Sequence, residues 1–216
     1  RECTPKRTNR VDLAETVDST AGDTWLAMTT TRGLRERADP VTMLTAYDAT
    51  TARLSDDCGI DILLVGDSMG TEALGYDSTL PVTVEAVESR TAAVARGSDN
   101  ALVVADMPFL SVGVDESETV RNAGRMLKDA GADAVKLESG PHTVEVTERL
   151  TQLGIPVMAH LGLTPQHVNQ LGGYTRQGTT EAAAEEILSL ARKHEAAGAF
   201  ALVVEHVPAN VAAQVT

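Results

Sequence analysis

The chain has 216 residues, and its 43% hydrophobic content excludes a predominantly disordered protein. Its two cysteines, Cys3 and Cys58, are too few for a disulfide scaffold, and the sequence lacks the run of about 18 apolar residues that a membrane span needs. The 18 basic and 31 acidic residues give a net charge of −13, the wrong sign for binding DNA or RNA phosphates. We therefore expect a folded, cytoplasmic protein that binds neither nucleic acid nor membrane.

The basic residues are mostly arginine, since the sequence contains only four lysines. High acidity, few lysines and many threonines resemble the surface of a protein from a salt-adapted organism. Charge of this kind describes the solvent in which the protein works and leaves its reaction open.

The first 27 residues are polar and irregular, and no apolar segment follows their basic residues as a secretory signal requires. Met28 opens a more regular stretch. We expect residues 1–27 to be a disordered arm or upstream sequence, and residues 28–216 to form one catalytic domain.

From Val41 onward, short apolar runs alternate with longer stretches of helical periodicity. The predicted strands are 41–45, 62–65, 102–105, 134–137, 157–159 and 201–204. The predicted helices are 49–58, 84–96, 117–130, 142–153 and 181–197. A glycine follows each helix, and we expect it to end that helix in the left-handed conformation: Gly59, Gly97, Gly131, Gly154 and Gly198.

Apolar strands that alternate with helices predict an α/β protein with a parallel sheet. The sheet can be an open doubly wound sheet or a (β/α)8 barrel of the TIM type. Neither GxGxxG nor GxxxxGK[ST] follows the first strand, which favours the barrel. Only about six βα units are present where the barrel has eight, so we expect a barrel that is incomplete at the C-terminus.

Acidic residues follow three neighbouring predicted strands, at Asp67, Asp106 and Glu138. The carboxyl ends of parallel strands meet at one edge, where TIM-type barrels carry their active sites. Three carboxylates brought together repel one another unless a cation lies among them, and oxygen ligands select a hard ion such as Mg²⁺. The sequence therefore predicts a magnesium site at this edge.

Three further residues lie at the same predicted edge. Lys136 is two residues before Glu138 and shares its face, so it can pair with the acids or hold a substrate carboxylate. Glu205 ends the sixth strand, across the mouth from the acids, and is placed to act as a general base. His160 ends the fifth strand, and a structural or a functional role is open for it.

With these residues in view, the sequence resembles the ketopantoate hydroxymethyltransferase family. The resemblance runs in family order from about Met28 to Thr216. It rests on TMLTAYD at 42–48, VGDSMG at 65–70, GYDSTLPVT at 75–83, VVADMPF at 103–109, VKLE at 135–138, AHLGLTPQ at 159–166, GGYTRQG at 172–178 and LVVEHVP at 202–208.

The resemblance implies a (β/α)8 barrel that transfers a one-carbon unit from 5,10-methylenetetrahydrofolate to 3-methyl-2-oxobutanoate. The product is ketopantoate, on the route to pantothenate and coenzyme A. The family usually assembles as a decamer, so a homo-oligomer is implied. Family members continue past this chain with a glycine-rich seventh strand and an eighth unit.

The family's functional residues map onto the acids and their neighbours in this sequence. Asp67, Asp106 and Glu138 match its Mg²⁺ environment. Asp67, Ser68, Asp106 and Lys136 match its keto-acid contacts. Glu205 matches its catalytic base.

Two other functions compete with this interpretation. One is another Mg²⁺-dependent enzyme acting on a 2-oxo acid, of the phosphoenolpyruvate mutase and isocitrate lyase superfamily. Those enzymes typically use a catalytic cysteine loop, whereas Cys58 precedes Gly59 at a predicted helix end. The other is a truncated chain that binds metal and keto acid without turning them over.

Overall fold

The computed structural model describes residues 29–216, so the predicted arm at 1–27 and the predicted start at Met28 lie outside the described residues. The strands are β1 (Met43–Thr45), β2 (Ile62–Val65), β3 (Leu102–Asp106), β4 (Ala134–Glu138), β5 (Val157–Gly162) and β6 (Ala201–Glu205). The helices are α2 (Thr31–Glu36), α3 (Ala49–Asp57), α4 (Met69–Glu72), α5 (Val84–Gly97), α6 (Glu116–Lys128), α7 (Val144–Gln152), α8 (Val168–Leu171), α9 (Glu181–Ala196) and α10 (Ala209–Val215). Two 3-10 turns, η1 (Pro141–Thr143) and η2 (Pro165–His167), precede α7 and α8.

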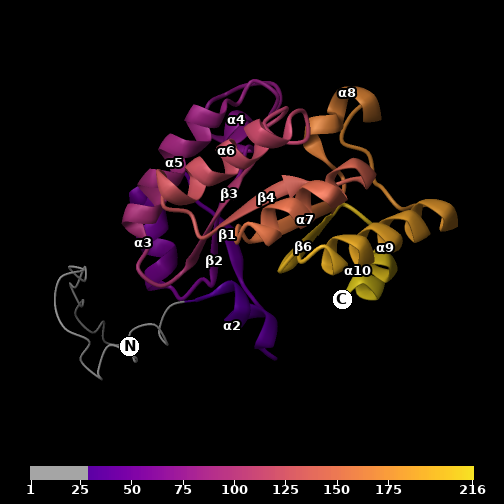
Figure 1. The fold of residues 1–216 in the computed structure, drawn as a ribbon, viewed down its shortest axis with the longest axis horizontal. Helices are drawn as coiled ribbons and strands as arrows, with labels where there is room; N and C mark the ends of the chain where they lie inside the picture. The colour runs from indigo at the N-terminus through magenta and orange to yellow at the C-terminus, as the bar shows by residue number, and fades with distance from the viewer. Residues whose placement is uncertain (1–28) are drawn as a thin grey trace.

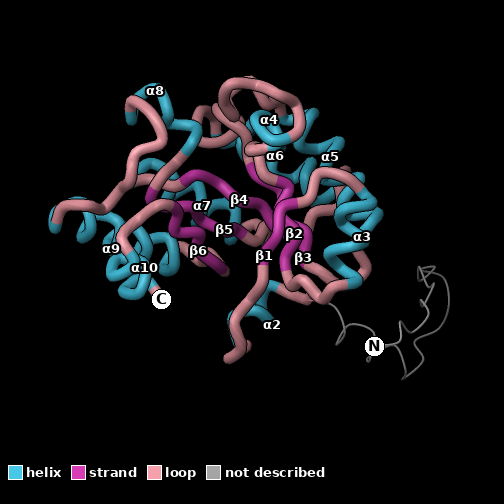
Figure 2. The backbone as a smooth tube through the Cα atoms, turned by 180° about the vertical axis from the view of Figure 1, so that it is seen from behind, coloured by secondary structure: helices cyan, strands magenta, loops and turns pink. Residues whose placement is uncertain are grey.

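The six strands form one parallel sheet whose order in space follows the chain, from β1 to β6. A doubly wound sheet would reverse direction at a switch point, whereas a TIM-type barrel keeps consecutive strands adjacent. Helices α3, α5, α6 and α7 lie in front of the sheet in Figure 1, and Figure 2 shows the strands in front of these helices. The fold is therefore the predicted α/β, TIM-type class, a curled half-barrel with about six βα units.

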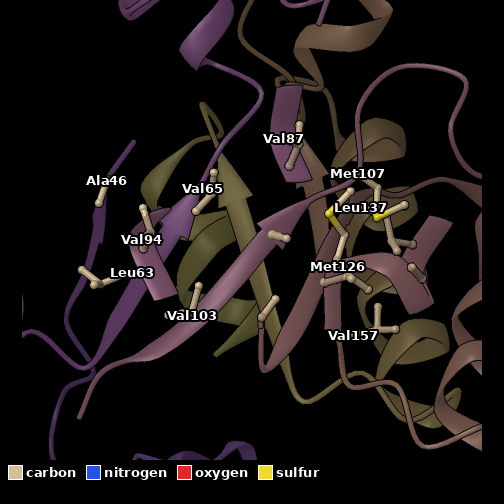
Figure 3. Close-up of a cluster of buried hydrophobic side chains, with 14 of the residues drawn as sticks. Ala46, Leu63, Val65, Val87, Val94, Val103, Met107, Met126, Leu137 and Val157 are labelled. Atoms are coloured by element: carbon tan, nitrogen blue, oxygen red, sulfur yellow. The ribbon is translucent and has the colours of Figure 1, made fainter. Parts of the chain in front are cut away.

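Alternate residues of β2, β3 and β4, with Val157 of β5, point to the helix-covered outer face and contribute to the larger core (Figure 3). Leu63 and Val65 of β2 and Val103 of β3 pack there against Val87 and Val94 of α5. These side chains are at most 3% exposed, so the outer face is a dry layer that fixes the positions of the strands.

The other alternate residues form a second apolar cluster on the inner face, which includes Leu64, Val104 and Met158. Leu34 of α2 packs against this cluster and covers its amino-terminal end. Within residues 29–216, β1 pairs with β2 alone and β6 with β5 alone.

Helix starts in this protein are fixed by side-chain caps. Asp48 accepts hydrogen bonds from the backbone N–H groups of Thr50 and Thr51 at 2.8 and 2.9 Å and so begins α3. Further caps of this kind are Thr30, Thr83, Asp115 and Thr180. Every helix within residues 29–216 is too short or too polar to span a lipid bilayer.

The predicted glycine stops are confirmed at four helices and wrong at one. Four of these glycines have positive φ: Gly59, Gly131, Gly154 and Gly198. Gly97 instead is the last residue of α5, and a Cβ there would lie 2.4 Å from the backbone oxygen of Ala49. Glycine is required at Gly97 by the close approach of α5 to the start of α3.

We therefore expect Gly97→Ala to lower the free energy of unfolding by about 1–3 kcal/mol, the usual cost of inserting a methyl group into a packed contact. Gly124→Ala, in α6, is the matched control, because no atom outside its own helix lies within 4 Å of a Cβ at Gly124. That control should gain up to about 1 kcal/mol from the better helix propensity of alanine. Urea denaturation of both variants tests this contrast, and equal effects would contradict the packing explanation.

Candidate active site

The polar residues predicted at the strand ends continue the inner face of the sheet. Asp106 follows the inner-face residues Leu102 and Val104 at a spacing of two, and the same periodicity brings Lys136, Glu138, His160 and Glu205 to this face. Strands β3, β4 and β6 are therefore apolar at their starts and end in an acidic residue. The structure groups the predicted polar residues at one edge of the sheet.

Lys136 and Asp106 form the central ion pair of this edge. They face each other across β3 and β4, and the Lys136 Nζ donates to Asp106 Oδ2 at 2.6 Å. Both side chains are buried. Burial alone would lower the pKa of Lys136, but the charges of Asp106 and Asp67 outweigh it and raise the pKa, so the ammonium is retained.

Asp67 lies beside this pair in the turn that follows β2. Its backbone N–H donates to Asp106 Oδ2 at 3.3 Å, and a Cβ at the neighbouring Gly66 would lie 2.8 Å from Ser68 Oγ. Burial, and next the negative charge of Asp106, raise the pKa of the Asp67 carboxyl well above its ordinary value.

Glu138, at the end of β4, is the third buried acid. The backbone N–H of Gln166 donates to both of its oxygens, at 3.0 and 3.1 Å, and His167 Nδ1 lies 3.3 Å from Oε2. Burial nonetheless raises the pKa of Glu138 to about 8, against the opposing effects of Gln166 and Lys136.

Gln166 is a site residue that the sequence analysis missed. Its side-chain Nε2 donates to Asp67 Oδ2 at 2.8 Å and to the backbone oxygen of Met107 at 3.0 Å. It lies in η2, which begins at Pro165 and follows β5. The glutamine falls within the quoted motif AHLGLTPQ, but no local pattern indicates that it reaches Asp67, after β2, and Glu138, at the end of β4.

Ser68 and Glu205 lie on a cavity of about 740 Å³ at this edge, which Tyr174 and His206 also line. The hydroxyl oxygens of Ser68 and Tyr47 lie 3.0 Å apart, within hydrogen-bond distance. The cavity therefore exposes Glu205, at the end of β6, and Ser68, after β2, whereas the three buried acids and Lys136 do not line it.

Glu205 differs from the three buried acids because its side chain is 44% exposed. His160 Nε2 lies 3.1 Å from Glu205 Oε2, and this contact holds the pKa of Glu205 below its ordinary value. Burial and the charge of Lys136 lower the pKa of His160. The deprotonated carboxylate of Glu205 thus faces the cavity, and the buried imidazole of His160 lies next to it.

The charges of the buried cluster do not balance. When ionised, Asp67, Asp106 and Glu138 carry three negative charges and Lys136 carries one positive charge, a net −2. Asp106 Oδ1 is buried without a hydrogen-bond partner among the described residues. Oxygen donors with this surplus charge suit a hard divalent cation such as Mg²⁺. As the side chains stand, however, no three His, Cys, Asp or Glu groups within residues 29–216 converge as a metal site, so the ligand set stays a prediction.

A curled parallel sheet with buried acids at the carboxyl ends of its strands defines the class of TIM-type α/β proteins with a site at the barrel mouth. Within that class, the family model for ketopantoate hydroxymethyltransferase matches residues 26–216, and the chain belongs to this family. The resemblance seen in the sequence motifs is thereby confirmed.

A curated relative is the 3-methyl-2-oxobutanoate hydroxymethyltransferase of Halobacterium salinarum, 72% identical over 181 residues. The match covers 84% of this chain and 66% of the relative, so the chain spans about two thirds of the length of that protein. Its source is a halophilic archaeon, in agreement with the salt-adapted composition.

Solved structures support the fold. A 2,3-dimethylmalate lyase, of the PEP mutase/isocitrate lyase superfamily, has a TM-score of 0.61 at 19% identity, over 87% of this chain and 68% of that chain. A phosphonopyruvate hydrolase, solved with oxalate and Mg²⁺, has a TM-score of 0.63 at 16% identity, over 87% and 68%. At these identities the likeness concerns the fold alone.

The raised pKa of Glu138 leads to a pH-dependent stability. Because its pKa is about 8 in the folded protein against 4.5 ordinarily, the folded state holds the proton more tightly between these values. In EDTA, the free energy of unfolding should therefore fall as the pH rises through this window. The contribution of Glu138 is at most about 5 kcal/mol, at about 1.4 kcal/mol per pH unit.

Glu138→Gln removes this titration and keeps an oxygen that accepts from Gln166 N–H. In urea denaturation between about pH 5 and pH 9, the free energy of unfolding of the variant should rise relative to that of the wild type as the pH increases. Glu148→Gln, at an exposed position of α7, serves as the control and should parallel the wild type. Parallel curves for Glu138→Gln would contradict the assigned cost of burying this carboxylate.

Proposed function

We propose that this protein transfers a hydroxymethyl group from 5,10-methylenetetrahydrofolate to 3-methyl-2-oxobutanoate, giving ketopantoate for pantothenate and coenzyme A synthesis. Family membership supports the reaction class. The observation that carries the assignment to this site is the placement of Glu205, a deprotonated and accessible carboxylate, opposite a buried acidic cluster that contains one lysine. The reaction needs both a base that removes a proton and a neighbouring site that stabilises the anion formed.

The chemistry starts at C3 of the keto acid. The Glu205 carboxylate takes the C3 proton, and the electron pair moves toward the keto oxygen to give an enolate. Mg²⁺, held by Asp67, Asp106 and Glu138, would supply charge stabilisation for the keto and carboxylate oxygens. Both C–N bonds that join the one-carbon unit to the folate then break: the enolate carbon replaces one nitrogen, and a hydroxyl from water replaces the other. The proton taken by Glu205 and the remaining proton of that water end on the two folate nitrogens.

The remaining residues bind and orient the keto acid. The Lys136 ammonium, fixed by Asp106, adds a positive charge beside the developing enolate oxygen. Ser68 offers a hydroxyl at the cavity wall, where Tyr47 orients it. His160 lies next to Glu205, with 3.1 Å between Nε2 and Oε2, and keeps it ionised by lowering its pKa.

We further propose that the protein acts in the cytoplasm and as a homo-oligomer, which the family resemblance implies. Its ligands under this proposal are the two small-molecule substrates and Mg²⁺. The structural likeness to the phosphoenolpyruvate mutase and isocitrate lyase superfamily does not change the proposed reaction. Cys58 is exposed and precedes β2, at the amino-terminal edge of the sheet, away from the buried acids.

Asp67→Asn tests the cation site, because it removes one negative charge and keeps an oxygen that accepts from Gln166. We expect the affinity for Mg²⁺ to fall by more than the roughly 10–100-fold that loss of an outer-shell partner costs. Titration calorimetry measures this. Asp77→Asn, at an exposed residue of the same cavity, is the control and should bind Mg²⁺ like the wild type. Unchanged affinity in Asp67→Asn would remove Asp67 from the ligand set.

Glu205→Gln tests the base. The substitution keeps the size of the side chain and removes the proton acceptor, so binding of Mg²⁺ and keto acid should persist. Exchange of the C3 proton into D₂O, followed by NMR without folate, should slow by roughly 10²–10⁴-fold.

Glu72→Gln is the matched control, since Glu72 is an exposed acid on the same cavity, and it should exchange at the wild-type rate. Exchange at the wild-type rate in Glu205→Gln would exclude Glu205 as the base and direct attention to His160. A wild-type chain that binds the keto acid without exchanging its proton would instead identify a binding protein without turnover.

A further inference from the structure

The side-chain amide of Gln166 connects parts of the site that lie far apart in the sequence. Gln166 and Asp67 are 99 residues apart, yet Nε2 reaches Asp67 Oδ2 at 2.8 Å while also donating to the Met107 carbonyl at 3.0 Å. An amide nitrogen has two hydrogens, and these two acceptors use both. The side chain is thus held in one orientation by partners that follow β2 and β3.

The backbone of the same residue holds a second acid. Gln166 N–H donates to both oxygens of Glu138, on β4. One residue in the turn after β5 therefore orients two of the three buried carboxylates, and only 9% of it is exposed. The third carboxylate, Asp106, is held by Lys136.

The two kinds of donor differ in their effect on charge. Lys136 cancels one negative charge of the cluster, whereas an amide donates hydrogen bonds and leaves the charge of its acceptor in place. A lysine or arginine in the position of Gln166 would bring the net charge of the cluster from −2 to −1. A neutral donor leaves in place the surplus negative charge that favours the binding of a divalent cation.

We infer that Gln166 is a positioning residue, which orients Asp67 and Glu138 for a divalent cation without neutralising them. The inference rests on the cation site of the proposed function and adds to it a residue that does not itself ligate the ion. Because outer-shell partners orient metal ligands, losing one weakens binding even when every ligand remains.

Two substitutions separate orientation from charge. Gln166→Met keeps the length of the side chain and the backbone bond to Glu138 but removes both amide donors. Gln166→Lys keeps a donor and adds a positive charge. Gln177→Met is the matched control, because the amide of Gln177 also donates twice, to Thr175 O and Oγ1, outside the acid cluster.

The measurements are Mn²⁺ binding by electron paramagnetic resonance and thermal unfolding in EDTA. We expect Gln166→Met to weaken Mn²⁺ binding by about 10–100-fold. We expect Gln166→Lys to abolish Mn²⁺ binding and to raise the unfolding temperature in EDTA, since the added charge offsets the repulsion among the buried acids. Gln177→Met should bind Mn²⁺ like the wild type.

Opposite effects of Gln166→Lys on stability and on ion binding would not arise from a merely structural role. Wild-type Mn²⁺ affinity in a cooperatively folded Gln166→Met overturns the inference and leaves the cation site standing. Absence of Mn²⁺ binding in the wild type overturns both. Should Gln166→Met lack a cooperative transition, Gln166→Asn, which keeps the amide on a shorter stem, takes its place under the same criteria.

Discussion

The site depends on the burial of three carboxylates around a single ammonium. Buried charges of one sign repel strongly because the surrounding dielectric is low, and here Lys136 compensates only Asp106 directly. Burial, followed by the negative charge of the neighbouring acids, raises the pKa values of Asp67 and Glu138 and makes this edge of the sheet costly to fold when both are ionised. The outer apolar core, centred on residues such as Leu63 and Val103, supplies the stability that allows this arrangement.

The fold separates the three buried acids from the accessible Glu205. The buried acids lie on β3, β4 and the turn after β2, where covering side chains exclude water. Glu205 ends β6, at the more open side, where its carboxylate is accessible from the cavity. One sheet therefore carries buried acids and an accessible carboxylate; under the proposed function the first would bind the cation and the second would take the proton.

Much of this could be predicted from the sequence, and the failures have physical causes. The apolar runs predicted all six strands, but each of three predicted strands ended one residue too early. Asp106, Glu138 and Glu205 are the last residues of β3, β4 and β6, because backbone pairing continues after the side chains become polar. Gly97 was predicted to end its helix with a positive φ, but it is required for close packing. A sequence does not distinguish these two reasons for a glycine. The predicted strand-end residues do gather at one edge. Gln166 was missed because its partners are distant in the chain.

The strand order also has a consequence for how the molecule assembles. Because each strand pairs with the next one in the chain, every pairing closes a single helical crossover and none spans the whole sheet. The bond from Gln166 to Asp67 is different, because it joins residues 99 positions apart. It fastens the turn after β5 directly to the turn after β2, so it links parts of the sheet that the strand pairing connects only through β3 and β4.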